Sequence, residues 1–398
     1  MEALNWDVAV VGCGPAGSLA ALESSIRGLN VIVLEEHGKV GEPDHCAGLV
    51  SVTGLKRLGL RVPEECVLNR VYGARFYSPS GVSFSVSRRS VQALVIDRRM
   101  FDRWLASLAQ SAGAHLTLKR KVTSFVRSLD GVHVHVKGGG EEKCKLLIDA
   151  EGCRARLAKM AGLPPRRGRR PAVRFEVRGV DVDPDFVELH FGGRLAPGFF
   201  AWVIPTDEGA RVGLAARSHP RKRLAKFLST RFPRAKVSRT VAGVVLTNGP
   251  VKRTFTDRFM AVGDAAGQVK PTTGGGVVTG GICSRIAGQV ASEALQEERF
   301  SSGFLKRYQQ RWEKILGKEF SYMKLARRVL NRLSDHALDS LFKALIEHGG
   351  TETMEAYGDM DFESAAIKKL IANPKILVKL ALALLTLANP EKSAAPTA

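Results

Sequence analysis

The segment 6–36, WDVAVVGCGPAGSLAALESSIRGLNVIVLEE, constrains the fold more than any other part of the chain. It predicts an apolar strand, a glycine-rich turn, a helix of small residues and a second strand. A β-α-β unit of about 30 residues forms parallel strands with a helix packed across them. We therefore predict an α/β protein that opens with a Rossmann-like unit.

Three glycines in the turn of this unit follow the spacing GxGxxG: Gly12, Gly14 and Gly17. The first allows the tight turn, the second lets a pyrophosphate approach the backbone, and the third lets the helix pack closely. The following helix would offer free N–H groups and partial positive charge to the phosphates. Glu35 ends the second strand, where a carboxylate accepts hydrogen bonds from adenosine ribose and repels a 2′-phosphate. FAD or NAD is therefore favoured over NADP.

A second glycine-rich segment, GDAAGQVKPTTGGGVVTG at 263–280, also follows an apolar strand and precedes a helix. Asp264 is placed to bond a ribityl hydroxyl. The backbone of 273–277, at a helix N-terminus, could stabilise negative charge on a reduced isoalloxazine. A nicotinamide enzyme does not need this second motif, so the two segments together predict FAD.

The charge and the cysteine content limit which partners and which cellular compartment the protein can have. The 398 residues include 60 Lys+Arg against 39 Asp+Glu, a formal charge of +21, which favours an anionic partner. The basic residues are spread along the chain without a nucleic-acid-binding motif, so we expect no nucleic acid. The six cysteines include no CxxC pair, which predicts no metal or iron–sulfur site. With no signal peptide evident, we predict a cytoplasmic protein.

The order of the predicted elements suggests four segments. Phe304, Tyr308, Trp312, Leu316 and Phe320 recur every fourth residue and predict a helix with one buried face. We predict a first part of the FAD-binding domain at 1–170, whose strand hairpin at 71–96 contributes to the substrate domain; a β-rich substrate domain at 171–251; a second part of the FAD-binding domain at 252–300; and a helical region at 301–398.

Five motifs together resemble the geranylgeranyl reductase family of FAD-dependent flavoproteins, and within it the archaeal digeranylgeranylglycerophospholipid reductases. They are VVGCGPAGS, GEPDHCAGLVS, VIDRRMFDRWL, GFFAWVIP and GDAAGQVKPTTGGGVVTGG, within a resemblance that covers about residues 5–300. The resemblance implies a Rossmann-like FAD-binding domain of the para-hydroxybenzoate hydroxylase-like group, with an inserted β-rich substrate domain and a helical C-terminus. It also implies reduction of isolated C=C bonds in geranylgeranyl chains of archaeal ether phospholipids, using reduced FAD.

Matching these motifs position by position implies a set of FAD contacts. They are Ala16, Glu35, Cys46, Ala47, Leu49, Arg98, Val122, Asp264, Gly276 and Val277. Cys46 stands in a Gly/Pro-rich stretch before a short helix predicted near 49–58. We hypothesise that its thiol helps to deliver a proton; the alternative is that Cys46 only shapes the flavin face. A helix N-terminus next to the thiol would lower its pKa.

The implied chemistry also needs an apolar tunnel, because an isolated alkene has no carbonyl group to polarise. The segment GFFAWVIP at 198–205 supplies candidate wall residues: Phe199, Phe200, Trp202 and Pro205. The alternative is ordinary strand packing. The prenylated ether lipid itself would be reached at an anionic membrane surface.

The basic amphipathic segment 365–385, AAIKKLIANPKILVKLALALL, could dock on that membrane, giving peripheral contact with the inner face of the cell membrane. The alternative is a terminal helix packed on the core. No second GxGxxG is present for a resident nicotinamide, so the electron donor stays open between NAD(P)H and an acidic ferredoxin.

Other classes share parts of this pattern. An aromatic monooxygenase shares the fold but gives no reason for a cysteine beside the flavin. A halogenase fits FAWVIP, one Phe-for-Trp change from WxWxIP, but fits HCAGLVS poorly. A quinone oxidoreductase of the electron-transfer-flavoprotein type needs a C-terminal cysteine cluster, whereas only Cys283 follows Cys153. A non-catalytic FAD-bearing lipid-binding protein is the fourth alternative.

Overall fold

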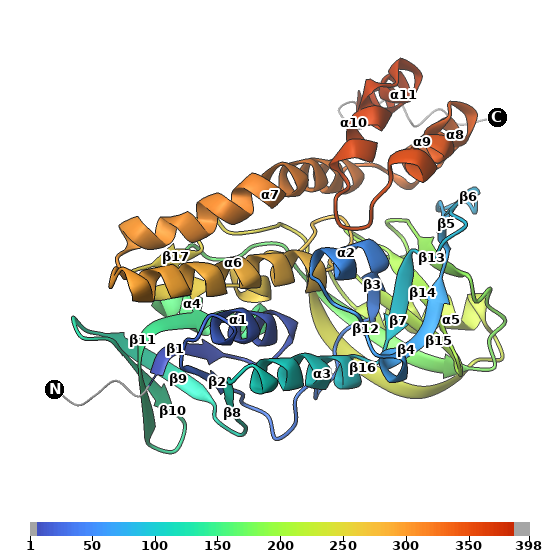
Figure 1. The fold of residues 1–398 in the computed structure, drawn as a ribbon. Coiled ribbons are helices and arrows are strands. Elements are labelled where there is room, and N and C mark those ends of the chain that lie inside the picture. Colours follow the sequence, from blue (N-terminus) through green and yellow to red (C-terminus); the bar gives the residue numbers. More distant parts are fainter. Residues whose placement is uncertain (1–5, 386–398) are drawn as a thin grey trace, which may run out of the picture.

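A largely parallel sheet forms the first body of the chain in the computed structural model, which describes residues 6–385 (Figure 1). The strand order is β17-β18-β11-β1-β2-β8, and β9 and β10 extend the sheet from β11. The strands are β1 (Trp6–Val11), β2 (Val31–Leu34), β8 (His115–Thr117), β9 (Val122–Arg127), β10 (Val132–Val136), β11 (Gly140–Asp149), β17 (Phe255–Thr256) and β18 (Phe259–Ala261). β1 pairs in parallel with β2 and with β11, as the β-α-β pattern predicts.

Helices cover this sheet and carry its main apolar core. α1 (Pro15–Ser25), α3 (Arg98–Ser111) and α6 (Val277–Gln296) lie together, and α7 (Ser302–Leu330) runs along α6 (Figure 1). The aromatic stripe predicted for 304–320 is buried in the same cluster as β1, which confirms the predicted buried face. The short α4 (Arg156–Met160) packs against β9.

A seven-stranded sheet forms the second body, in the order β16-β12-β15-β14-β13-β5-β6. Its strands are β5 (Gly73–Tyr77), β6 (Ser83–Ser87), β12 (Arg169–Arg178), β13 (Phe186–His190), β14 (Ala201–Thr206), β15 (Gly209–Ala215) and β16 (Lys236–Leu246), with α5 (Pro220–Arg231) packed against β12 and β15. A third, three-stranded sheet joins β3 (Leu49–Ser51), β7 (Ala93–Ile96) and β4 (Val67–Val71). Domain boundaries remain a prediction, because strand pairing alone does not show which segment folds independently.

The helix predicted over 49–58 is only partly right. Its first three residues form β3, which pairs with β7, and α2 (Val52–Arg57) begins after them. Ser51 caps α2, since its hydroxyl accepts a hydrogen bond from the Gly54 N–H at 2.9 Å. The cross-strand pairing overrides the local preference for helix.

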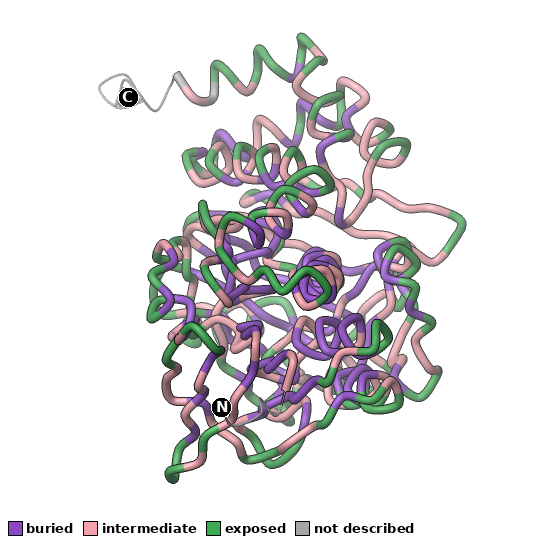
Figure 2. The backbone as a smooth tube through the Cα atoms, turned by 60° about the vertical axis from the view of Figure 1, so that its left-hand side comes forward, coloured by how far each residue is buried: buried purple, intermediate pink, exposed green. Residues whose placement is uncertain are grey.

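Four further helices gather at one end of the molecule: α8 (Asp335–Glu347), α9 (Gly350–Tyr357), α10 (Ser364–Ala372) and α11 (Pro374–Leu385) (Figure 1). The loop 358–363 between α9 and α10 returns to the main body, where Asp359 forms an ion pair with Arg57 at 2.9 Å. Most of α11 is exposed, in contrast to the buried centre of the molecule (Figure 2). Among residues 6–385, no helix has the length and apolar character required to cross a membrane.

Candidate functional site

The first glycine-rich turn is packed tightly on one side and open on the other. A Cβ at Gly17 would lie 1.8 Å from the Gly12 carbonyl oxygen, and one at Gly12 would lie 2.5 Å from the Ala150 oxygen. At Gly14, by contrast, nothing lies within 4 Å of the Cβ position. The open side of the turn therefore faces outward at Gly14, where the sequence predicts the pyrophosphate.

Two helix N-termini near this turn have no side-chain cap. Gly14 is the N-cap of α1 and Gly276 that of α6, and neither helix has an acidic residue in its first turn. The leading N–H groups of such helices lack intrahelical partners and carry partial positive charge. Both ends therefore suit the anionic parts of a dinucleotide, the pyrophosphate and the reduced isoalloxazine.

The two glycine-rich turns meet in space. The Ala16 Cβ lies 2.6 Å from the position a Cβ on Gly263 would take, so the second turn tolerates only glycine there. A Cβ on Gly276 would lie 3.1 Å from Asp264 Oδ1. Burial raises the pKa of Asp264, against the opposing charges of Arg166 and Arg98. Ala16, Asp264 and Gly276 are thus brought together, as one cofactor spanning both turns requires.

Glu35 is held at the end of β2 by backbone donors. Its Oε2 accepts the Cys13 N–H at 2.8 Å, and its Oε1 accepts the His37 N–H at 2.9 Å. His37 Nδ1 also lies 2.6 Å from Oε1, whereas Oε2 keeps a lone pair for a further donor. Ribose hydroxyls would be such donors, and that role stays a prediction.

Asp149 is a buried carboxyl that the sequence analysis did not select. It ends β11 beside Val11, and its Oδ2 is buried without a hydrogen-bond partner. Burial, with the nearby charge of Glu151, raises the pKa of Asp149 to about 7. A buried atom without a partner next to the first turn fits a site completed by a bound group.

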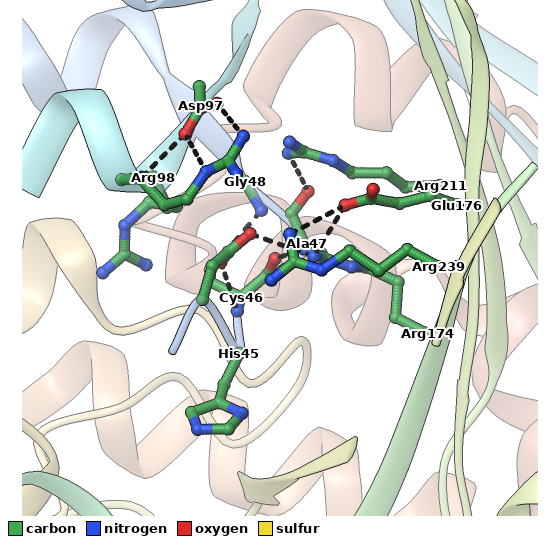
Figure 3. Close-up of polar contacts among 12 residues, drawn as sticks. His45, Cys46, Ala47, Gly48, Asp97, Arg98, Arg174, Glu176, Arg211 and Arg239 are labelled. Carbon is green, nitrogen blue, oxygen red and sulfur yellow. Dashed lines mark hydrogen bonds and ion pairs between the residues drawn. The ribbon is translucent and has the colours of Figure 1, made fainter. Parts of the chain in front are cut away.

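Two buried arginines of the second sheet fix the loop that carries Cys46 (Figure 3). Arg174 of β12 pairs with Asp44 at 2.9 Å and also donates to the Cys46 carbonyl. Arg211 of β15 donates to the Ala47 carbonyl at 3.0 Å. Burial alone would raise the pKa of Asp44, but Arg174 outweighs it and holds that pKa below its usual value. The loop is therefore anchored to the seven-stranded sheet.

The Cys46 side chain itself is half-buried and makes few polar contacts. Its Sγ accepts the Gly48 N–H at 3.4 Å. β3 separates Cys46 from α2, so no helix begins directly after the residues that carry the thiol. His45 points away from this loop, with Nδ1 2.8 Å from the Ala242 oxygen (Figure 3).

The remaining residues predicted to contact FAD lie partly near the two glycine-rich turns and partly in the apolar core. Arg98 forms a two-point ion pair with Asp102, at 2.8 and 2.9 Å, which together with other acids raises its pKa despite burial. Leu49 packs against the cluster that includes Phe199, Phe200 and Trp202, and Val277 against the cluster around Leu19. Val122 is buried in the core beneath β1 and β2. Its carbonyl accepts a hydrogen bond from Arg156 at 3.0 Å, so a cofactor contact at Val122 stays a prediction.

The predicted tunnel wall is a buried aromatic cluster beside the Cys46 loop. The Phe199 and Phe200 rings stack at 4.2 Å between centroids, and Trp202 lies edge-on to Phe200 at 6.2 Å. Ala47 and Leu49 pack against this cluster. Pro205, the next-to-last residue of β14, pairs with Ala210 of β15. Whether the aromatic face receives a ligand or only packs the sheet stays a prediction.

A charged cluster from distant parts of the chain supports the second turn, and sequence reasoning missed it. Lys270 Nζ lies 3.0 Å from Asp361 Oδ1, and the Thr272 hydroxyl donates to Glu363 at 2.7 Å. Burial raises the pKa of Glu363 to about 7, whereas Asp361 and other acids raise that of Lys270 against its burial. The partners stand about 90 residues apart in sequence, so no local pattern signals them.

Comparison with known families identifies the class. The chain matches the family described as FAD binding domain over residues 5–311. With two uncapped helix N-termini meeting at one open turn, the fold and site define an FAD-dependent flavoprotein.

Curated relatives and a solved structure specify the family further. The chain is 38% identical over 86% of its length, and 92% of the relative, to digeranylgeranylglycerophospholipid reductase 2 of Methanothermobacter thermautotrophicus. It is 35% identical to the corresponding reductase of Methanocaldococcus jannaschii over 87% and 93% of the two chains. The chain belongs to the digeranylgeranylglycerophospholipid reductase family of FAD-dependent oxidoreductases.

Solved structures agree with the fold. A geranylgeranyl bacteriochlorophyll reductase-like protein from Thermoplasma acidophilum superposes with a TM-score of 0.86 at 26% identity, covering 95% of this chain and 99% of that one. The halogenase PltM in complex with FAD has a TM-score of 0.66 at 15% identity, covering 98% and 93%, and shows likeness of fold alone.

The second and third glycines of the first turn, Gly14 and Gly17, should respond differently to replacement by alanine. Gly17→Ala forces a methyl group into the Gly12 carbonyl, so we expect the apoprotein to lose about 3 kcal/mol of unfolding free energy. Gly14→Ala meets no protein atom, so we expect nearly unchanged stability but an FAD Kd at least about tenfold higher, or ~1.4 kcal/mol. Denaturant unfolding and FAD titration measure the two effects; equal FAD affinity in Gly14→Ala would contradict the pyrophosphate position.

Proposed function

We propose that this protein saturates isolated C=C bonds in the geranylgeranyl chains of archaeal ether phospholipids, by hydride transfer from reduced FAD with coupled protonation. The observation that carries this proposal is the contact between the segment after Cys46 and the apolar cluster that holds the aromatic residues: Ala47 and Leu49 pack against the cluster that includes Phe199, Phe200 and Trp202. An apolar wall thus adjoins the one half-buried thiol in the predicted flavin contacts. The names of the curated relatives support the same substrate class.

Bound FAD, once reduced, supplies the hydride. The chain's own residues have three other tasks. The aromatic wall holds the prenyl chain and excludes water, which compensates about 0.8 kcal/mol for each CH₂ that leaves the lipid phase. The carbonyl anchors at Cys46 and Ala47 keep the loop in place, and the Cys46 thiol holds the proton at Sγ.

Anaerobic turnover tests the reaction. Enzyme pre-reduced with dithionite should be reoxidised by a geranylgeranyl ether phospholipid, and mass spectrometry should show a gain of two hydrogens for each bond reduced. Reoxidation by oxygen alone would contradict the proposed reductase activity and favour the monooxygenase and halogenase alternatives. The same assay, with NAD(P)H or a reduced ferredoxin replacing dithionite, decides between the two donors that the sequence leaves open.

We also propose a cytoplasmic protein in peripheral contact with an anionic membrane. α11 packs one face, Ile376, Leu380 and Leu384, toward the protein. Its other face exposes Leu377, Val378 and Leu382, which are 44%, 57% and 54% accessible. Exposed lysines, Lys375 and Lys379, flank these side chains. Apolar groups between lysines are typical of interfacial helices.

Replacing Leu377 and Leu382 together with serine should reduce binding to vesicles of anionic phospholipid at least about tenfold. Leu129→Ser is the matched control, because Leu129 is 99% accessible and lies in the β9–β10 turn. Vesicle co-sedimentation measures the effect. Equal binding of the double variant and the control would exclude α11 as the docking helix.

A further inference from the structure

We propose that Arg170, Arg217 and Arg327 form a binding site for the phosphate group of the lipid substrate, at the edge of the aromatic wall. This inference rests on the proposed function, which gives the aromatic wall a prenyl chain to hold. It adds the place where the polar end of that lipid is recognised.

Two of the arginines converge on the glycine that precedes the wall. A Cβ on Gly198 would lie 3.2 Å from Arg217 Nε and 3.3 Å from Arg170 Nε. Arg170 comes from β12, and Arg217 follows β15, where its N–H donates to the Pro197 carbonyl at 3.0 Å. Two guanidinium groups from different strands therefore flank one point of the chain, next to Phe199.

The third arginine joins this point to the aromatic rings. Arg327 of α7 is buried, and its Cζ lies 4.7 Å from the Phe199 ring centroid and 6.0 Å from that of Phe200. Its Nε donates to the Pro271 carbonyl at 3.0 Å, which holds the guanidinium in place. The positive groups thus adjoin the apolar wall, as the polar and apolar ends of a lipid would require.

Among residues 6–385, none of these three arginines forms an ion pair with a carboxylate within 4.0 Å. Within residues 6–385, the Arg217 side chain has no ion pair or hydrogen bond, and Arg170 Nε is buried without a partner. Burial and the charge of Arg217 lower the pKa of Arg170. Burial lowers the pKa of Arg327 to about 10. The charge of Glu363 opposes this lowering, whereas the charge of Arg170 adds to it. Like charges held this close are stabilised by a bound anion.

A groove lined by both arginines and acids elsewhere on the molecule shows the contrast. An open groove of about 590 Å³ is lined by Arg75 and Arg231, among others. There Arg75 pairs with Asp183, and Arg231 pairs with Glu188 at 2.9 Å. Those charges are already satisfied within the protein. Among the described residues, the cluster at Gly198 instead combines arginines without ion pairs with an apolar wall.

A phosphate ester fits this cluster because guanidinium groups bind phosphate oxygens through paired, charge-assisted hydrogen bonds. The test compares a geranylgeranyl ether lipid carrying phosphate with the same lipid lacking it. We expect the wild-type protein to show at least tenfold higher kcat/KM for the phosphorylated lipid. In the double variant Arg170→Gln, Arg217→Gln that ratio should fall at least tenfold, chiefly through a higher KM. Inorganic phosphate should inhibit only weakly, because it lacks the chain.

Arg61→Gln is the matched control, since Arg61 is exposed and has no side-chain partner among the described residues. An unchanged ratio in the double variant, or an equal fall in the control, would overturn the phosphate site. Fluorescence titration with both lipids separates this outcome from failure of the proposed function. If neither lipid were reduced, loss of the affinity difference in the double variant would still support the site, and its retention would refute it.

Discussion

Cys46→Ala is expected to retain FAD and to reduce alkene turnover by about 100-fold or more. The backbone anchors of the loop, Arg174 to the Cys46 carbonyl and Arg211 to the Ala47 carbonyl, do not involve the thiol. The cofactor surroundings should therefore survive. Loss of a positioned proton donor typically costs 10²–10⁴-fold in rate. Single-turnover reoxidation of pre-reduced enzyme by the lipid isolates the chemical step from electron supply.

Cys153→Ala is the control for a half-buried cysteine outside the Cys46 loop. It should leave the reoxidation rate within a factor of two. Cys46→Ser keeps a small proton-bearing group and is expected to retain more activity than Cys46→Ala. Full activity in Cys46→Ala would exclude the proton role and leave Cys46 as a residue that only shapes the flavin face.

Arg174→Met is expected to lower the free energy of unfolding by about 3–5 kcal/mol at neutral pH. The Asp44 and Arg174 side chains are only 2% and 3% accessible, so removing the guanidinium leaves a buried carboxylate without its cation. The Cys46 carbonyl also loses its donor. Denaturant unfolding of the apoprotein measures the change, and a loss below about 1 kcal/mol would contradict the assigned burial of the pair.

The same variant has a defined pH dependence. Arg174 holds the pKa of Asp44 below its usual value, so the pair's contribution is fully present above about pH 4 and is lost as pH falls through the lowered pKa. The difference in unfolding free energy between wild type and Arg174→Met should therefore be largest near neutral pH and shrink below about pH 4. Adding Asp44→Asn to Arg174→Met should recover part of the loss at neutral pH.

Local patterns predicted those parts of the fold whose causes are local. The β-α-β unit was readable because Gly12 and Gly17 touch each other's backbone within a few residues. The stripe of α7 was readable because one face of a helix repeats regularly. FAD followed from two strand–turn–helix segments that only a long cofactor requires together.

The remaining features depend on contacts between distant segments. Arg174 sits between Val173 and Phe175 in β12, where alternation places it on the face away from the core. It is buried because the loop around Asp44 covers that face. Residues 49–51 pair with β7 rather than starting a helix. Lys270 and Asp361 meet across about 90 residues of sequence, so neither gave any local sign of its partner.

The loop 358–363 makes the C-terminal helices inseparable from the rest of the protein. Asp361 provides the carboxylate for the buried Lys270 ammonium and accepts the Ser51 hydroxyl hydrogen bond. Removing only the Asp361 carboxylate would leave the buried Lys270 ammonium without its ion pair, at a cost of about 3–5 kcal/mol. These helices therefore cannot be exchanged among relatives as a module. A chimaera that exchanges these helices between relatives must keep Asp361 and Lys270 together.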